Sequence, residues 1–132
     1  MGDYKYKRVM LIDDSEIDNF VNQKVIEMSR FAGEIQIFQS PIEALSYLKQ
    51  NIKNETALPN IILLDIRMPV MDGFGFLDAF EKLPEEIRKY CKIIMLSTSD
   101  SIEDLNRVNK CKYVSKFLNK PLSEANLAAV NV

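Results

Sequence analysis

Side chains that could take part in chemistry follow four apolar runs of this sequence, each at the point where the run ends. Asp13 and Asp14 follow VMLI, Asp65 follows IILL, Ser97 follows IIML, and Lys120 follows FLN. If the runs are parallel strands, their carboxyl ends lie at one edge of a sheet, which is where open α/β sheets bind ligands. The three carboxylates then converge if the first and third runs are neighbouring strands.

Such a cluster of acids needs a positive partner. Two carboxylates about 5 Å apart repel each other by roughly 3 kcal/mol at an effective dielectric constant near 20, so the cluster either retains a proton or binds a cation. An all-oxygen site with few protein ligands suits Mg²⁺, which keeps several waters and accepts one or two carboxylates together with phosphate oxygens. The pattern therefore predicts a Mg²⁺ site that can hold a phosphoryl group.

Simpler structural explanations exist for most of these residues taken alone. Asp14 or Ser15 could cap the first helix while the neighbouring acid binds a metal. Ser97 could be a loop hydroxyl, and Lys120 could be a solvated surface lysine. Asp65 is harder to explain in this way, because an acid at a strand tip without a capping role has little structural purpose. The joint arrangement favours a functional site.

Composition limits the remaining possibilities. The 132 residues contain no histidine, which excludes a Ser-His-Asp triad, histidine acid–base catalysis and histidine-ligated zinc. The net charge of -2 does not favour direct nucleic-acid binding. The apolar runs are far shorter than the roughly 20 residues that a membrane span needs. Cys91 and Cys111 lack paired spacing, and no charged-then-apolar leader opens the chain, so we expect a cytoplasmic protein.

The elements that must position the site are short apolar strands separated by helices. The predicted strands are Val9–Ile12, Ile35–Phe38, Ile61–Leu64, Ile93–Leu96 and Val114–Leu118. Runs such as IILL are apolar on both faces, which is typical of a sheet that is covered on both sides. Five β-then-α units indicate an α/β fold with a parallel sheet, because parallel strands need crossover connections. The polar stretch 51–56 is interpreted as an ordinary surface loop.

Helical periodicity fills the segments between these strands. After the first strand, one helical face carries Ile17, Phe20, Val21, Val25 and Met28. Ser40-Pro41-Ile42-Glu43 then combines an N-cap residue, a proline at the first helical position and a glutamate three residues after the cap. This stretch predicts a helix with Ile42, Leu45 and Leu48 behind it. Three further helices are predicted: one after Asp72-Gly73 with Phe74, Leu77 and Phe80 inward, one after Ser101 with Ile102, Leu105 and Val108 inward, and one capped by Ser123 with Leu127 and Val130.

The ordered set of motifs resembles the receiver domain of two-component response regulators. The resemblance rests on Asp13-Asp14 after the first strand, Asp65 after the third with Pro69 and Met71-Asp72-Gly73 beyond it, Ser97 after the fourth and Lys120-Pro121 after the fifth. It covers residues 7–130 and implies one receiver domain over 1–132. The implied fold is a flavodoxin-like (βα)5, doubly wound three-layer α/β sandwich, whose five-stranded parallel sheet has the strand order 2-1-3-4-5.

The resemblance also implies a role for each site residue. Asp65 is the phosphoacceptor, whose carboxylate attacks a phosphohistidine to form an acyl phosphate. Mg²⁺ is bound by Asp14, Asp65 and the backbone carbonyl of Arg67, with Asp13 acting mainly through water. Lys120 pairs with one phosphoryl oxygen and Ser97 hydrogen-bonds another. The donor histidine belongs to a partner, a sensor histidine kinase or a histidine phosphotransfer protein.

Three further positions concern tuning and switching. Arg67 and Ser99 lie two residues after Asp65 and Ser97, where side chains in the family influence the lifetime of the phosphoryl group. Arg67 could shield the acyl phosphate from water or reach across to an acid. Phe117 occupies the family's aromatic switch position, and we expect it to fill the space vacated when Ser97 moves toward the phosphoryl group. The family also suggests a cis bond before Pro121.

We expect a stand-alone receiver without an output domain, because about a dozen residues follow Lys120. It would be a monomer or weak dimer that binds an unknown downstream protein, with Lys110, Lys112 and Lys116 forming either a partner face or a solvated basic face. A receiver fragment of a larger regulator or hybrid kinase is the alternative. A haloacid-dehalogenase-like phosphatase needs a second acid two residues after the nucleophile, where Arg67 stands. A flavodoxin-like binding module needs a phosphate loop that does not follow the first strand here.

Overall fold

The computed structural model describes residues 4–97 and 102–132, and a sheet of five parallel strands lies at its centre. The strands are β1 (Tyr6–Ile12), β2 (Ala32–Phe38), β3 (Ile61–Asp65), β4 (Lys92–Ser97) and β5 (Val114–Asn119). The helices are α1 (Glu16–Met28), α2 (Pro41–Gln50), α3 (Gly73–Glu81), α4 (Glu85–Tyr90), α5 (Ile102–Asn109) and α6 (Glu124–Ala128), with a short 3-10 helix at Glu55–Ala57.

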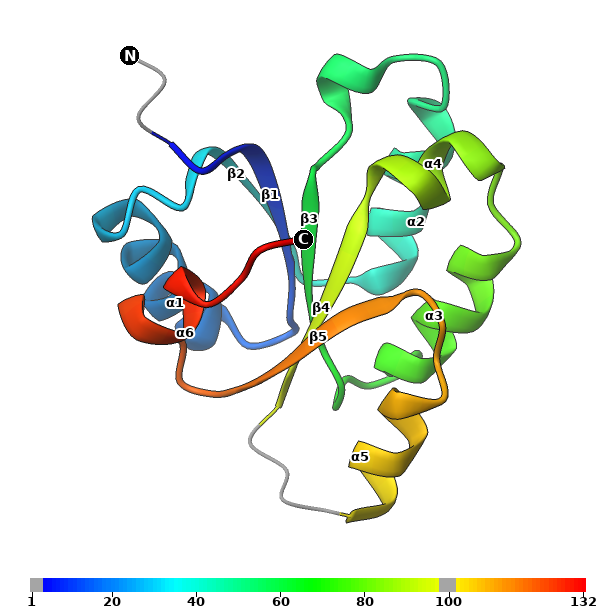
Figure 1. The fold of residues 1–132 in the computed structure, drawn as a ribbon. Helices are drawn as coiled ribbons and strands as arrows, with labels where there is room; N and C mark the ends of the chain where they lie inside the picture. The colour runs from blue at the N-terminus through cyan, green and yellow to red at the C-terminus, as the bar shows by residue number, and fades with distance from the viewer. Residues whose placement is uncertain (1–3, 98–101) are drawn as a thin grey trace.

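The strand order is β2-β1-β3-β4-β5. Helices α1 and α6 cover one face of the sheet, and α2, α3, α4 and α5 cover the other (Figure 1). The structure therefore confirms the predicted flavodoxin-like (βα)5 sandwich and its strand order. Among the described helices, none has the length and apolar content that crossing a bilayer requires.

Successive residues of the central strands point into two separate apolar cores. Met10 and Ile62 lie in the core that α2 to α5 cover, whereas Leu11 and Leu63 lie in the core beneath α1 and α6. β1 and β3 are direct neighbours, and Ile12 pairs with Leu64 at their carboxyl ends. This register brings the acids that follow the two strands to the same edge of the sheet.

Helix α1 does not pack on the sheet through its apolar face. Ile17, Phe20 and Met28 are 76%, 60% and 73% exposed, and Val21 is also exposed, so only Val25 of the predicted face packs against the core. The buried residues are instead Asn19, Asn22 and Ile26. The Asn19 side-chain amide donates a hydrogen bond of 2.8 Å to the backbone carbonyl of Asp13, which holds this polar side inward.

The other predicted helices are present, with local differences in the residues they bury. Ser40 and Ser123 cap α2 and α6 through their side-chain oxygens, and both Leu127 and Val130 are buried. Ile42 is half exposed, since Ala44 packs inward beside Leu45 and Leu48.

Helix α5 also differs from the expectation. Leu105 is 37% exposed, whereas Asp104 and Val108 are buried. Ser101 and the side chain of Ile102 lie outside the described residues.

Two short helices were not expected from the sequence. The 3-10 helix Glu55–Ala57 overlaps the end of the segment 51–56 interpreted as a surface loop. Helix α4 begins after Pro84 and buries only Ile87, so it has no apolar periodicity. Acidic residues in its first turn and basic residues in its last turn complement the helix dipole and favour the helix.

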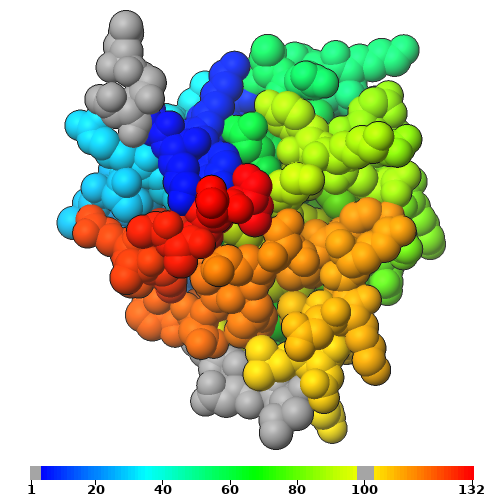
Figure 2. All heavy atoms as spheres, in the orientation of Figure 1, coloured from blue at the N-terminus to red at the C-terminus, as the bar shows by residue number. Residues whose placement is uncertain are grey.

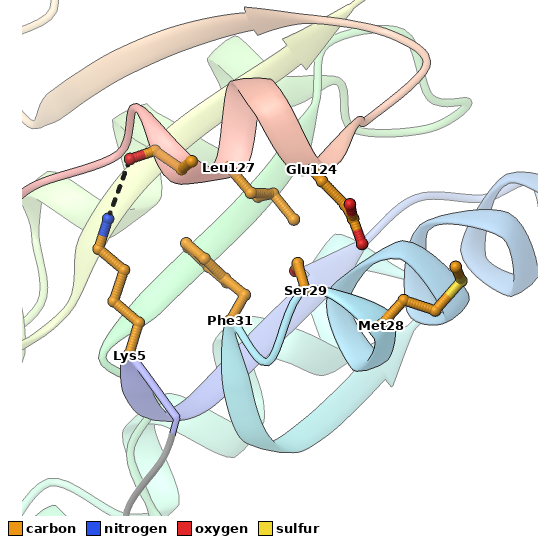
Figure 3. Close-up of a pocket in the computed structure, with 7 residues that line it drawn as sticks. Lys5, Met28, Ser29, Phe31, Glu124 and Leu127 are labelled. Atoms are coloured by element: carbon orange, nitrogen blue, oxygen red, sulfur yellow. Dashed lines mark hydrogen bonds between the residues drawn. The ribbon is translucent and has the colours of Figure 1, made fainter.

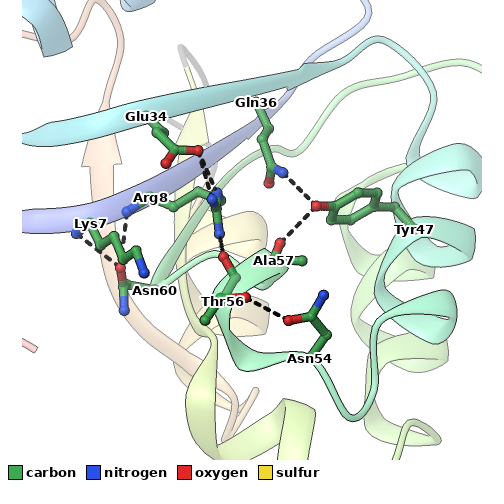
Figure 4. A network of polar contacts seen from close by, with 9 residues as sticks. All are labelled: Lys7, Arg8, Glu34, Gln36, Tyr47, Asn54, Thr56, Ala57 and Asn60. Carbon is green, nitrogen blue, oxygen red and sulfur yellow. Dashed lines mark hydrogen bonds and ion pairs between the residues drawn. The ribbon is translucent and has the colours of Figure 1, made fainter.

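A polar network closes the amino-terminal edge of the sheet (Figure 4). Arg8 forms an ion pair with Glu34 on β2 and donates a hydrogen bond to the backbone oxygen of Thr56. Asn60 accepts hydrogen bonds from the backbone N–H groups of Lys7 and Arg8, each at 3.0 Å. The network fixes the connector before β3 and so supports the strand that carries Asp65.

The carboxyl-terminal segment is fastened to the start of β1, and the two lie against each other at the surface (Figure 2). The Lys5 ammonium donates hydrogen bonds to the backbone oxygens of Ala128 and Val130. Leu127 and Phe31 point into the space between α6 and the end of α1 (Figure 3). These contacts hold α6 on the same face of the sheet as α1.

Gly73 lets the loop after β3 fold back onto the strand end. A Cβ at this position would lie 2.7 Å from the backbone oxygen of Asp65 and 3.0 Å from Cα of Ile66. The Gly73 N–H also donates a hydrogen bond of 2.8 Å to the Ile66 carbonyl. This close approach leaves no room for a larger residue.

We predict that Gly73→Ala lowers the free energy of unfolding by about 1–3 kcal/mol, because the added methyl group can be accommodated only by moving backbone. Gly75→Ala is the matched control: its Cβ meets the flexible Met71 side chain at 3.0 Å, and alanine has the higher helix propensity. Urea titration of both variants measures the difference. Equal losses in the two variants would contradict the argument.

Candidate functional site

Three carboxylates meet at the carboxyl edge of the sheet. Asp13, Asp14 and Asp65 each offer an oxygen atom, and these atoms lie within 4.8 Å of one another. Asp13 and Asp65 are only 3% and 7% exposed, whereas Asp14 faces solvent. The site is therefore a buried acidic pair that opens to water on the Asp14 side.

The loop between β1 and α1 holds Asp13 in place. The backbone N–H of Ser15 donates a hydrogen bond of 2.9 Å to Asp13 Oδ1. Ser15 is itself the N-cap of α1, because its hydroxyl oxygen accepts a hydrogen bond from the Asp18 N–H at 3.2 Å. Ser15 therefore caps the helix, and the two aspartates before it, Asp13 and Asp14, belong to the acidic cluster.

Lys120 is the buried cation of the site. Its ammonium group lies 2.5 Å from Asp13 Oδ2, 2.9 Å from Asp18 Oδ2 and 3.2 Å from Asp65 Oδ1. The side chain is 9% exposed, which excludes a solvated surface lysine. The backbone N–H of Lys120 donates a hydrogen bond to the backbone carbonyl of Ser97. The peptide bond between Lys120 and Pro121 is cis, as the resemblance suggests.

Asp18 is a site residue that sequence reasoning missed. It lies in the first turn of α1, not at a strand end, and it meets Lys120 from a position 102 residues away. The only sequence signal for Asp18 is an acidic residue in the first turn of a helix. Such residues are common because they interact favourably with the helix dipole, so the signal is weak.

Burial and charge shift the pKa values of the central pair. Burial, reinforced by the negative charge of Asp13, raises the pKa of Asp65 to about 6, although Lys120 works in the opposite direction. Burial of Lys120 works to lower the pKa of its ammonium group, but hydrogen bonds to Asp13 and Asp18 and the charge of Asp65 raise that pKa above its ordinary value. Lys120 is therefore charged at neutral pH.

The donor set fits a hydrated Mg²⁺ ion. All three groups are carboxylates, and one faces water. Mg²⁺ prefers oxygen ligands and keeps several waters, so few protein ligands and an open side are suitable. A divalent cation would also offset the negative charge of Asp13, which adds to the effect of burial in raising the pKa of Asp65.

The structure describes three of the four residues predicted to act in switching or in tuning. Ser97 ends β4 and is buried, and Phe117 lies on the neighbouring strand, where it is partly buried against the core beneath α2 to α5. The Arg67 guanidinium forms an ion pair with Asp104 of α5. Of the two alternatives predicted for Arg67, the structure shows the second, in which the side chain reaches across to an acid. Ser99 lies outside the described residues.

Comparison with known proteins defines the class to which this fold and site belong. Residues 9–131 match the family model of the response regulator receiver domain. The chain is 29% identical over 119 residues to the probable methanogenesis regulatory protein FilR2 of Methanothrix harundinacea, covering 90% of this chain and 75% of that protein. It is 30% identical over 100 residues to the response regulator Rcp1 of Synechocystis, covering 75% and 67%.

A solved structure shows the same likeness. The crystal structure of a two-component response regulator from Cytophaga hutchinsonii superposes with a TM-score of 0.83 at 29% identity, covering 94% of this chain and 95% of that one. The chain belongs to the response regulator receiver domain family, a family of signalling domains.

We predict that Asp65→Asn stabilises the metal-free protein at pH 7 by about 1–3 kcal/mol, at 1.36 kcal/mol per pKa unit. The pKa of Asp65 is about 6 in the folded state, above the ordinary aspartate value of 3.8, so the folded state holds this proton more tightly than the unfolded chain does. Stability from this group is therefore present at low pH and is lost as the pH rises through the folded pKa.

Urea titrations of wild type and variant between about pH 4 and pH 7 measure this effect. The difference should shrink toward the acidic end. Asp78→Asn, which removes an exposed acid of α3 outside the cluster, serves as the control and should change little. A destabilised Asp65→Asn protein at pH 7 would contradict the prediction.

Proposed function

We propose that this chain is a phosphoacceptor switch, in which a phosphoryl group passes from a partner's phosphohistidine to Asp65 in a Mg²⁺-dependent reaction. The observation that carries the proposal is the placement of Asp65 between two other carboxylates and one buried ammonium group. A carboxylate in this setting can act as a nucleophile. The lysine and a divalent cation together offset the charge of an incoming phosphoryl group.

In the proposed reaction, an Asp65 oxygen forms a bond to phosphorus while the bond from phosphorus to the donor imidazole nitrogen breaks. Asp14, Asp65 and the backbone carbonyl of Arg67 would bind Mg²⁺, with Asp13 held mainly at the second layer. Mg²⁺ would supply charge neutralisation at the phosphoryl oxygens. Lys120 donates to one of these oxygens, and Ser97 would donate to another.

The output of the switch would be a change in a protein-binding face. We propose that Ser97 moves toward the phosphoryl group and that Phe117 follows it inward, which shifts a two-state equilibrium. The Arg67–Asp104 ion pair links the loop after Asp65 to α5, and we propose that it influences the lifetime of the phosphoryl group together with Ser99. The domain would act in the cytoplasm as a stand-alone receiver that binds a downstream protein.

We predict that incubation with acetyl phosphate and Mg²⁺ adds the mass of one phosphoryl group, which intact-mass spectrometry detects. The adduct should be absent in Asp65→Asn, because the nucleophile is lost, and in Asp14→Ala, because a metal ligand is lost. Asp78→Asn should label like wild type. Labelling that persists in Asp65→Asn would reject the assignment, and steady turnover of assorted phosphate esters would favour a phosphatase.

The exposed apolar face of α1 is suited to bind the phosphoryl donor. Ile17, Phe20 and Val21 lie on this face. The helix begins two residues after the exposed Asp14, so the face starts close to the open side of the site. Lys24 lies 5.4 Å from the Phe20 ring centroid. An apolar centre with a charged rim is typical of a protein interface, and a partner seated there would hold its phosphohistidine near Asp65.

We predict that Phe20→Ser and Val21→Ser slow phosphoryl transfer from a histidine phosphotransfer protein about tenfold, since each removes apolar contact area worth about 1–2 kcal/mol. Both variants should react with acetyl phosphate at the wild-type rate. Val132→Ser is the matched control, because Val132 and Val21 are 44% and 43% exposed and Val132 contacts Tyr6 at the start of β1. Unchanged transfer in all three variants would place the donor elsewhere.

A further inference from the structure

Asp18 contacts the site lysine without belonging to the metal cluster. Its carboxylate lies 2.9 Å from the Lys120 ammonium group, whereas the group of acids that could hold a metal comprises Asp13, Asp14 and Asp65. The backbone of Asp18 is held in place at the start of α1, because its N–H donates a hydrogen bond to the Ser15 hydroxyl oxygen. A fourth acid thus reaches the site from the helix side.

The geometry of the ammonium group explains what this contact can do. A lysine has three N–H donors and a flexible four-carbon stem. In this structure the three nearest acceptors come from three different elements: Asp13 after β1, Asp18 on α1 and Asp65 on β3. The ammonium group donates hydrogen bonds to Asp13 and Asp18, and Asp65 faces it as an ion pair at 3.2 Å. The two hydrogen bonds therefore fix how the ammonium group is presented to Asp65.

The contact to Asp13 is shared with the proposed metal site. A bound Mg²⁺ would attract the Asp13 carboxylate and so weaken the attraction between that carboxylate and the Lys120 ammonium group. Asp18 lies outside the cluster, so its hold on the lysine would persist. Asp18 is also 45% exposed at its side chain, which lets it contact Lys120 without the full penalty of a buried charge.

We propose that Asp18 is a positioning residue for phosphoryl transfer: it holds the Lys120 ammonium group so that one N–H points at the oxygen of Asp65 where the phosphoryl group arrives. The inference rests on the proposed function of Asp65. Positioning of this kind matters because a small misplacement of a charged donor reduces its effect on the transition state.

The test compares Asp18→Asn with Glu16→Gln. Both substitutions remove one negative charge from the first turn of α1, but Glu16 is exposed and outside the set of lysine contacts that the structure describes. At saturating Mg²⁺, Asp18→Asn should slow labelling by acetyl phosphate about tenfold, whereas Glu16→Gln should label at the wild-type rate. Asp18→Glu should recover part of the loss.

A second measurement follows the lysine directly, without any reaction. The NMR signal of the Lys120 Cε methylene group is identified by its absence in Lys120→Arg. In the Mg²⁺-loaded wild type this group should be rigid on the picosecond–nanosecond timescale, and it should become mobile in Asp18→Asn but not in Glu16→Gln.

The outcomes separate the inference from the function on which it rests. If Asp18→Asn labels as fast as Glu16→Gln, or if its Lys120 signal stays rigid, the positioning role is rejected while Asp65 remains the acceptor. If wild-type protein fails to label at all, the proposed function itself fails. A thermal melt of Asp18→Asn that matches that of Glu16→Gln shows that unfolding does not account for slow labelling.

Discussion

One buried ammonium group compensates the negative charge at the carboxyl edge of this sheet. Lys120 contacts acids that belong to three different parts of the chain, and without it Asp13 and Asp65 would be two buried carboxylates facing each other. Loss of Lys120 would leave these acids without their cation, and an uncompensated buried charge is strongly destabilising, typically by about 3–5 kcal/mol. Burial, together with the remaining repulsion from Asp13, raises the pKa of Asp65. This excess of negative charge suits the binding of a cation, and it supports the proposed role of Asp65 as a nucleophile.

The fold makes this imbalance possible by separating apolar packing from polar chemistry. The central strands are buried on both faces up to their last residue, and the polar side chains begin where the strands end. Tight contacts behind the site, such as Gly73 against the backbone of Asp65, leave Asp65 little freedom. A rigid platform of this kind would keep the proposed reacting groups in position before any ligand arrives.

The sequence contained enough information for the sheet, its parallel character and most of the site. Strand ends are easy to locate in a buried sheet because an apolar run stops at a polar residue, and this rule found Asp13, Asp14, Asp65 and Lys120. The same rule could not find Asp18, whose contact depends on how α1 is rotated about its axis. Periodicity showed that α1 has an apolar face but not which surface that face would meet. Helix α4 was missed because one buried residue makes no period.

The two sides of helix α1 differ in what they contribute to the fold. Its inward side, with Asn19 and Ile26, keeps the helix on the sheet, while Ile17, Phe20 and Val21 contribute little to the core. Substitutions on the outward side are therefore nearly free of consequences for folding. If this face binds the donor as proposed, partner choice can change through these few side chains while the fold stays the same.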